Sequence, residues 1–375
     1  MAPAPREDVV TLVPYEPGRP IETVQRELGL ERVIKLASNE SPWGPFPEAL
    51  EAMAGAAGDA NRYPDGGAYR LKEAIAARHG VSADQVAVGA GVDGIIRALC
   101  VAYLNPGDNV VCGWPSFPSY PNFARLMGAD AIRVPLAAGI YDPPAIRAAA
   151  TDRTRLAYLC TPNNPTGGAI SQSELRDFLD DPPPGALVVV DEAYHEYARL
   201  HRSGDRADAI PLVRDGAPCL VMRSFSKLYA LAGARVGYAI GPAEVVRTLE
   251  KVRAPFAVSS IAQAGALASL GVDDGRIAAR VGATIASLDR LGDALRQIGV
   301  PVGPDHANFL HVDLGRPGRP VFEELLREGL IVRPTDGFGA PDAIRVSAGT
   351  EEETDVAVDV LSRVLGRHAS AGAVA

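Results

Sequence analysis

Residues 224–238 read Ser-Phe-Ser-Lys-Leu-Tyr-Ala-Leu-Ala-Gly-Ala-Arg-Val-Gly-Tyr and follow an apolar run over residues 218–222 that is typical of a buried strand. Lys227 therefore stands just beyond a core element, where burial lowers the pKa of an amine and makes it a usable nucleophile. The alternative is an ordinary strand end with a solvated lysine. The same stretch offers three side chains suited to a phosphate: Ser224, Ser226 and Arg235.

The bulk composition is that of a globular protein, with 47% hydrophobic and 22% charged residues among 375. This length predicts two domains, or one large domain with an accessory layer. A formal net charge of −9 argues against a partner with a phosphate backbone or an anionic membrane, because either requires a basic face. We expect a cytoplasmic protein, because the sequence has neither a signal pattern nor a membrane-spanning apolar run. No metal site is expected, since the histidines form no metal-binding motif.

Short apolar runs alternate with helical patterns up to about residue 242, which indicates an α/β fold with a mostly parallel sheet between helices. We expect an irregular arm over residues 1–20 and a large domain over residues 46–242. Residues 21–45 and 243–375 are expected to form a smaller α+β domain. The expected strands of the large domain cover residues 86–88, 109–112, 131–134, 156–160, 187–190, 218–222 and 235–240.

Ligands of open parallel sheets bind outside the carboxyl ends of the strands, so the residues that follow each expected strand are candidates for a binding site. A glycine-rich turn at residues 89–94 precedes a helix whose start can hold a phosphate, although a plain tight turn would look the same. Trp114 or Phe117 could stack on a flat ring, or simply pack in the core. Asn163 and Asn164 lie in a turn with two prolines.

Asp191 follows the apolar run over residues 187–190, which fits a strand buried on both faces, and a carboxylate at a buried strand end needs a cationic partner. A protonated pyridine nitrogen is one such partner, and a salt bridge to a core arginine is the alternative. Tyr194 could bond a ring oxygen. With Lys227 and the phosphate donors, these groups suit one ligand, pyridoxal phosphate, which a lysine holds covalently.

Three motifs carry a family resemblance, namely Asn163-Asn-Pro-Thr-Gly167, Asp191-Glu-Ala-Tyr194 and Ser224-x-Ser-Lys227 followed by Arg235. With them, the chain resembles the fold-type I, class I/II aminotransferases, and among these the histidinol-phosphate aminotransferases. The resemblance runs over nearly the whole chain. It implies a homodimer that uses pyridoxal phosphate to move an amino group between L-glutamate and imidazole-acetol phosphate, yielding 2-oxoglutarate and L-histidinol phosphate.

The resemblance also implies roles for residues at matching positions. Lys227 would form the Schiff base and carry the proton. Asp191 would pair with the pyridine nitrogen. The ring oxygen would be bonded by Asn164 and Tyr194, and the ring stacked by Phe117. The phosphate would be held by Ser224, Ser226, Arg235 and the amides of Val92 and Asp93, with Tyr63 reaching the neighbouring subunit's phosphate.

For the substrate, Arg345 would grip a carboxylate bidentately, which lysine does poorly. Arg333 would lie near a substrate phosphate, with Tyr15 and Asn39 lining the pocket. Three positions depart from the family pattern: Ser41, where asparagine is usual, Gly94, where an acidic residue is common, and Phe117, where tyrosine is frequent.

Three other functions stay open at this point. An aromatic-amino-acid aminotransferase would share the arginine at position 333. A decarboxylase or oxidase would use the same cofactor and the same fold. A non-catalytic ligand sensor built on this fold would need a DNA-binding extension, for which the arm before residue 20 is too short.

Overall fold

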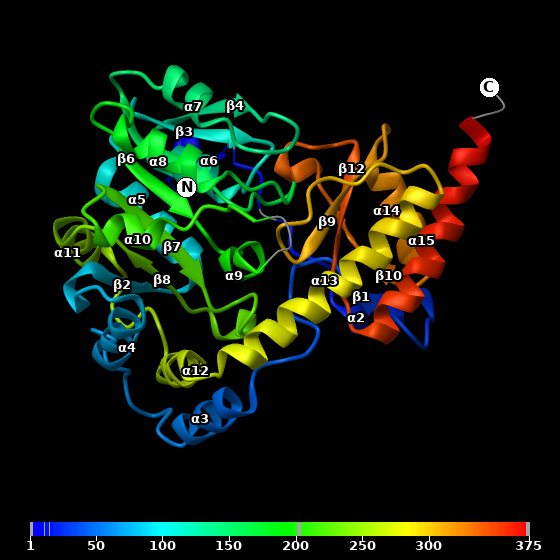
Figure 1. The fold of residues 1–375 in the computed structure, drawn as a ribbon, viewed down its shortest axis with the longest axis horizontal. Helices are drawn as coiled ribbons and strands as arrows, with labels where there is room; N and C mark the ends of the chain where they lie inside the picture. The colour runs from blue at the N-terminus through cyan, green and yellow to red at the C-terminus, as the bar shows by residue number, and fades with distance from the viewer. Residues whose placement is uncertain (1–2, 11, 15, 201–203, 373–375) are drawn as a thin grey trace.

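A seven-stranded sheet forms the centre of the larger part of the molecule (Figure 1). The computed structural model describes residues 3–10, 12–14, 16–200 and 204–372. Strand β8 is antiparallel to both of its neighbours and the other pairings are parallel, which confirms the predicted mostly parallel sheet. In spatial order the strands are β2 (Val86–Gly89), β8 (Gly237–Ile240), β7 (Cys219–Ser224), β6 (Leu187–Asp191), β5 (Thr154–Cys160), β3 (Asn109–Trp114) and β4 (Asp130–Pro135).

The central strands are buried on both faces, which explains why their sequences are unbroken apolar runs rather than alternating ones. Helices connect them and cover the sheet, so the carboxyl ends of the parallel strands meet at one edge. These helices are α5 (Gly91–Tyr103), α6 (Ser119–Leu126), α7 (Pro143–Ala149), α8 (Gln172–Asp180), α9 (His195–Arg199) and α10 (Ala209–Arg214).

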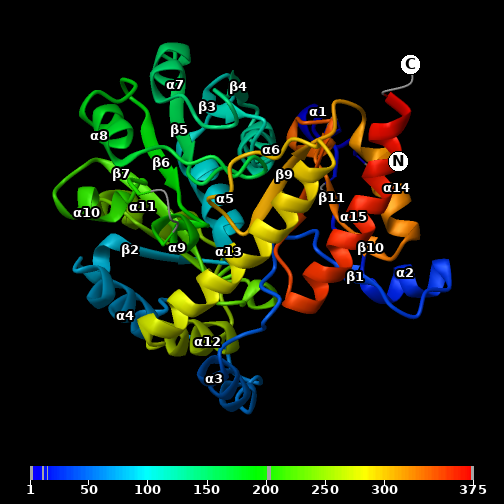
Figure 2. The same cartoon turned by 45° about the vertical axis from the view of Figure 1, so that its right-hand side comes forward.

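A second, smaller hydrophobic core lies beside the first (Figure 2). Its antiparallel sheet has the order β11 (Arg333–Pro334), β12 (Ala343–Ser347), β9 (Phe309–Asp313). Strand β1 (Ile34–Lys35) pairs in parallel with β10 (Leu330–Ile331), which joins an early segment of the chain to this part. The helices that complete it are α2 (Ile21–Leu28), α14 (Gly318–Arg327) and α15 (Glu351–Gly372).

Helix α13 (Asp274–Gln297) belongs to both cores. Ile277 and Val281, in its first half, are buried in the larger core, while Leu291 and Leu295 are buried in the smaller one. Helices α11 (Ala243–Val252) and α12 (Ser260–Leu270) pack in the larger core, α12 against α3 (Pro47–Ala57) and α4 (Tyr69–His79). This packing favours a domain boundary inside α13 over the one expected near residue 243.

The N-terminal arm crosses from one core to the other. It contains one helical turn, α1 (Glu7–Val10), which packs on α6 through an ion pair of 3.6 Å between Asp8 and Arg125. Further along, Glu16 pairs with Arg319 of α14 at 2.9 Å. Among the helices of the described ranges, none is long and apolar enough to cross a bilayer.

Candidate active site

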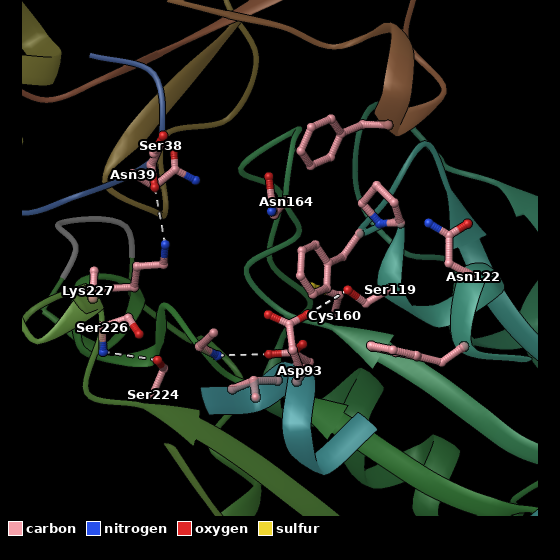
Figure 3. A pocket seen from close by; sticks show the side chains of 18 of the residues that line it. Ser38, Asn39, Asp93, Ser119, Asn122, Cys160, Asn164, Ser224, Ser226 and Lys227 are labelled. Carbon is pink, nitrogen blue, oxygen red and sulfur yellow. Dashed lines mark hydrogen bonds between the residues drawn. The ribbon is translucent and has the colours of Figure 1, made fainter. Parts of the chain in front are cut away.

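A cavity of about 620 Å³ opens at the carboxyl ends of β5, β6 and β7, between the two cores (Figure 3). The larger core, the smaller core and the N-terminal arm all contribute to its wall. Most of the site residues predicted from the sequence line it: Asn39, Val92, Asp93, Phe117, Asn164, Asp191, Tyr194, Ser224, Ser226, Lys227, Arg235 and Arg345.

Lys227 lies beyond the end of β7, as its position after an apolar run predicts. Its Nζ donates a hydrogen bond to the carbonyl oxygen of Ser38 at 3.3 Å and lies 5.6 Å from the centre of the Tyr194 ring. Burial, together with the smaller effect of the nearby Arg345 guanidinium, lowers the pKa of the Lys227 amine to about 8. A sizeable fraction of the amine is therefore neutral and nucleophilic near neutral pH.

Asp191 ends β6 and is almost completely buried. Its Oδ2 accepts a hydrogen bond from the Tyr120 hydroxyl at 2.7 Å, and its Oδ1 accepts one from the Ala193 amide at 3.1 Å. Burial raises the pKa of the Asp191 carboxyl to about 6 despite these two bonds. The core arginine of this region, Arg223, pairs with Glu192 at 2.7 Å instead. This geometry suits a cationic ligand group, such as a protonated pyridine nitrogen, beside Asp191.

Tyr120 is a site residue that the sequence reasoning missed. It stands in the first turn of α6, and its ring stacks on Tyr158 with 4.3 Å between the ring centres. Phe117 meets the Tyr120 ring edge-on at 5.7 Å and lines the cavity, whereas Trp114 lies under the Arg133 guanidinium. The sequence shows a tyrosine three residues after Phe117, but only the tertiary fold shows that the hydroxyl of this tyrosine reaches Asp191.

Replacing Tyr120 with phenylalanine removes the hydroxyl and leaves Asp191 Oδ2 without that donor. The ionised carboxylate is then less stable, so pairing with a cationic ring should weaken. We expect the affinity for pyridoxal phosphate to fall about tenfold, the usual effect of one lost hydrogen bond to a charged group. Fluorescence titration of the cofactor-free protein measures this, and an unchanged affinity would mean that the bond does not support the ligand.

The residues that were predicted to hold a phosphate lie where β7 ends and α5 begins. Ser224 Oγ accepts a hydrogen bond from the Ser226 amide at 3.0 Å. Arg235, in a left-handed conformation with φ 54°, places its Nη2 3.5 Å from Asp93. A Cβ on Gly91 would come within 2.6 Å of that nitrogen, so the glycine allows the guanidinium to lie against the start of α5. The free amides at this helix start favour an anion.

Arg345 lies on β12 of the smaller part, lines the cavity and is only 3% exposed. Its Nη1 donates to Asn164 Oδ1, and its Nη2 donates to the carbonyl oxygen of Ala37 at 2.8 Å. The rings of Phe309 and Phe338 lie 5.2 and 5.1 Å from its guanidinium. A planar, desolvated guanidinium in this position is suited to a carboxylate.

Two predicted residues among those that the structure describes, Tyr63 and Arg333, do not line the cavity. Tyr63 is 82% exposed and stacks on Phe256, with 4.6 Å between the ring centres. Arg333 lies opposite Arg345 in the β11–β12 pairing and donates to the carbonyl oxygen of Glu16 at 2.6 Å. Tyr15 lies outside the described residues. The sequence reasoning also missed several lining residues, namely Leu12, Val13, Pro14, Ser119, Asn122 and Phe338.

Residues 31–361 match the family described as aminotransferase class I and II. The chain belongs to this family. Two histidinol-phosphate aminotransferases are each 42% identical to this aminotransferase. The one from Moorella thermoacetica matches over 97% of this chain and 93% of its own length, and the one from Symbiobacterium thermophilum over 96% and 98%.

A solved structure agrees with these relatives. The histidinol-phosphate aminotransferase from Sinorhizobium meliloti, in complex with pyridoxal 5'-phosphate, superposes with a TM-score of 0.86 at 28% identity, covering 96% of this chain and 97% of that one. The likeness extends over both cores of this aminotransferase. It confirms the fold class and the family predicted from the sequence.

Proposed function

We propose that this aminotransferase uses pyridoxal phosphate to transfer an amino group between L-glutamate and imidazole-acetol phosphate, giving 2-oxoglutarate and L-histidinol phosphate. The observation that carries the substrate assignment is the 42% identity, over nearly the full chain, to histidinol-phosphate aminotransferases. The cavity supports the cofactor assignment, because it brings a lysine, a buried carboxylate and an anion cradle together.

Different side chains would bind different parts of the cofactor. Asp191 would bind the pyridine nitrogen, and Tyr194 and Asn164 the ring oxygen. Ser224, Ser226, Arg235 and the amides at the start of α5 would bind the phosphate. Bound pyridoxal phosphate supplies an electron sink for the substrate's amino carbon.

The residues that act on the substrate would be Lys227 and Arg345. Arg345 binds the anionic end of the substrate, which fixes how the amino carbon stands relative to the ring. Lys227 Nζ takes the proton from that carbon and returns a proton later, which its lowered pKa permits near neutral pH. The arm residues Leu12, Val13 and Pro14 line part of the cavity.

An aromatic-amino-acid aminotransferase is the second candidate, because apolar side chains including Phe117, Phe123 and Phe338 line the cavity. A substrate panel with glutamate as donor separates the two. Brisk transamination of phenylalanine together with inactivity on histidinol phosphate would overturn the proposed substrate. Analysis of the products for carbon dioxide, peroxide or keto acid tests a decarboxylase or oxidase reaction.

Replacing Arg333 with alanine should discriminate between substrates. If this guanidinium pairs with a substrate phosphate, its loss should lower kcat/KM for histidinol phosphate about a hundredfold and leave phenylalanine nearly unaffected. Arg319→Ala is the matched control, because Arg319 also holds Glu16 of the arm but by a side-chain ion pair. Equal losses on both substrates would assign Arg333 a purely structural role.

The homodimer and the cytoplasmic location stay predictions. Support for a second copy comes from exposed aromatic side chains on one region of the larger part. Tyr63 is 82% exposed, Tyr69 63% and Phe256 46%. Aromatic residues this exposed are typical of a surface that a protein partner covers. We propose that this surface contacts the second subunit, with Tyr63 directed to the neighbouring site.

A further inference from the structure

Three consecutive residues, 37–39, each bond to one of the principal side chains of the site. The carbonyl oxygen of Ala37 accepts from Arg345 Nη2 at 2.8 Å, and that of Ser38 accepts from Lys227 Nζ at 3.3 Å. Asn39 Nδ2 donates to the hydroxyl oxygen of Tyr194 at 2.9 Å. Figure 3 shows the bond between Ser38 and Lys227, with Asn39 beside Ser38. We refer to residues 37–39 as the junction segment.

Asn39 is held in place by the smaller core. Its amide nitrogen donates to Ser347 Oγ at 2.9 Å, and Asn308 Nδ2 donates to its carbonyl oxygen at 3.1 Å. Its φ of 55° lies in the left-handed region, which asparagine tolerates better than most residues. The side chain is also fully engaged, because Ser347 Oγ donates to Asn39 Oδ1 at 3.0 Å. Ser347 and Tyr194 already bond the two polar ends of the side-chain amide, so Asn39 is better placed to act on Tyr194 than on a substrate.

The direction of the Asn39–Tyr194 hydrogen bond determines whether the Tyr194 hydroxyl can donate its hydrogen to a ligand. Ser347 gives its hydroxyl hydrogen to Asn39 Oδ1, so the amide Nδ2 faces Tyr194. An amide nitrogen only donates, and the Tyr194 oxygen therefore accepts. The hydrogen of the phenol has no acceptor among the residues that the structure describes, and the side chain lines the cavity. That hydrogen is available to a ligand.

We propose that Asn39 is a positioning residue, which orients the Tyr194 hydroxyl so that its hydrogen is offered to the ring oxygen of the bound cofactor. Through Ser347, the same residue ties this phenol to β12, the strand that carries Arg345. The inference rests on the proposed use of pyridoxal phosphate and is independent of which amino acid is the substrate. It assigns Asn39 a role through Tyr194 in place of the substrate contact implied by the family resemblance.

The test is a pH titration of the visible absorbance of pyridoxal phosphate bound to the Asn39→Gly variant. Glycine keeps the positive φ and removes the donor without adding a charge. The phenol is then free to turn, and the deprotonated ring oxygen loses an oriented donor. We expect the midpoint of the spectral transition to rise by about one pH unit, a tenfold change in the proton equilibrium. The charged groups around the phenol, Lys227, Arg345 and Asp191, are all retained.

Asn39→Asp provides a second variant that keeps the size of the side chain. A carboxylate only accepts, so the Tyr194 hydroxyl should donate to residue 39 and no longer to the ligand. Its midpoint should rise as well. The shape of the side chain and its acceptor for Ser347 are preserved, which protects the fold of the junction segment.

A double-mutant cycle with Tyr194→Phe decides whether Asn39 acts through the phenol. In the Tyr194→Phe background, Asn39→Gly should produce no further shift of the midpoint. An unchanged midpoint in Asn39→Gly alone, or an undiminished shift without the phenol, would overturn the inference. A protein that takes up no pyridoxal phosphate would instead contradict the proposed function, and thermal unfolding measures any loss of stability separately.

Discussion

Replacing Lys227 with alanine is expected to reduce transamination by about ten-thousandfold, the upper range for loss of a general acid–base group. The variant should also lose the visible absorbance that arises when pyridoxal phosphate is held covalently. The physical reason is that Nζ is the one amine whose pKa burial lowers to about 8 among the described residues of the cavity. Stopped assays with glutamate and absorbance spectra of the purified variant measure both effects.

The pH dependence of cofactor capture provides a further check on Lys227. Only the neutral amine attacks an aldehyde, so the rate of covalent capture by the cofactor-free protein should rise with pH and level off above about 8. Circular dichroism of Lys227→Ala controls for folding. Turnover that survives in a folded variant would refute the lysine assignment.

Replacing Asp191 with asparagine should lower kcat by about a hundred- to a thousandfold, the range seen when one preorganised electrostatic partner is removed. Asparagine is nearly the same size and can still meet the Tyr120 hydroxyl and the Ala193 amide. What it removes is the negative charge opposite the proposed pyridine nitrogen. Steady-state kinetics at saturating cofactor measure the loss, and an unchanged kcat would show that the charge is not used.

The same substitution should stabilise the cofactor-free protein. Burial raises the pKa of Asp191 from 3.8 to about 6, so between these values the folded state keeps a proton that the unfolded chain releases. The free energy of unfolding therefore falls as pH rises through this window, by roughly 3 kcal/mol once above pH 6. Asparagine does not ionise. Calorimetry should find cofactor-free Asp191→Asn more stable than the parent at pH 7, with the difference vanishing below about pH 4.

The strands and the residues just after them could be predicted from the sequence because burial and chain order determine both. The expected run over residues 187–190 became β6 with one added residue, Asp191, and its carboxylate meets the same cavity as Lys227. A parallel sheet brings such strand ends together whatever the loop details. Motifs local to the chain, such as the glycine at 91 that begins α5, carry the same information.

Contacts between distant segments could not be predicted in this way. That the Tyr120 hydroxyl meets Asp191, 71 positions later in the chain, depends on the orientation of α6. Arg333 and Arg345 were expected from family positions and lie directly opposite each other in the β11–β12 pairing, yet only Arg345 lines the cavity. Asn39 was placed near the site, but its partner Tyr194 depends on how the two cores meet.

Helix α13 has a consequence for how the protein unfolds. Its 24 residues span about 36 Å at the usual rise, with Val281 sealed in one core and Leu291 in the other. If either core unfolds, half of this helix loses the apolar side chains against which it packs. Heat or denaturant should therefore melt the two parts in a single cooperative step, and limited proteolysis should release no stable fragment that contains one core alone.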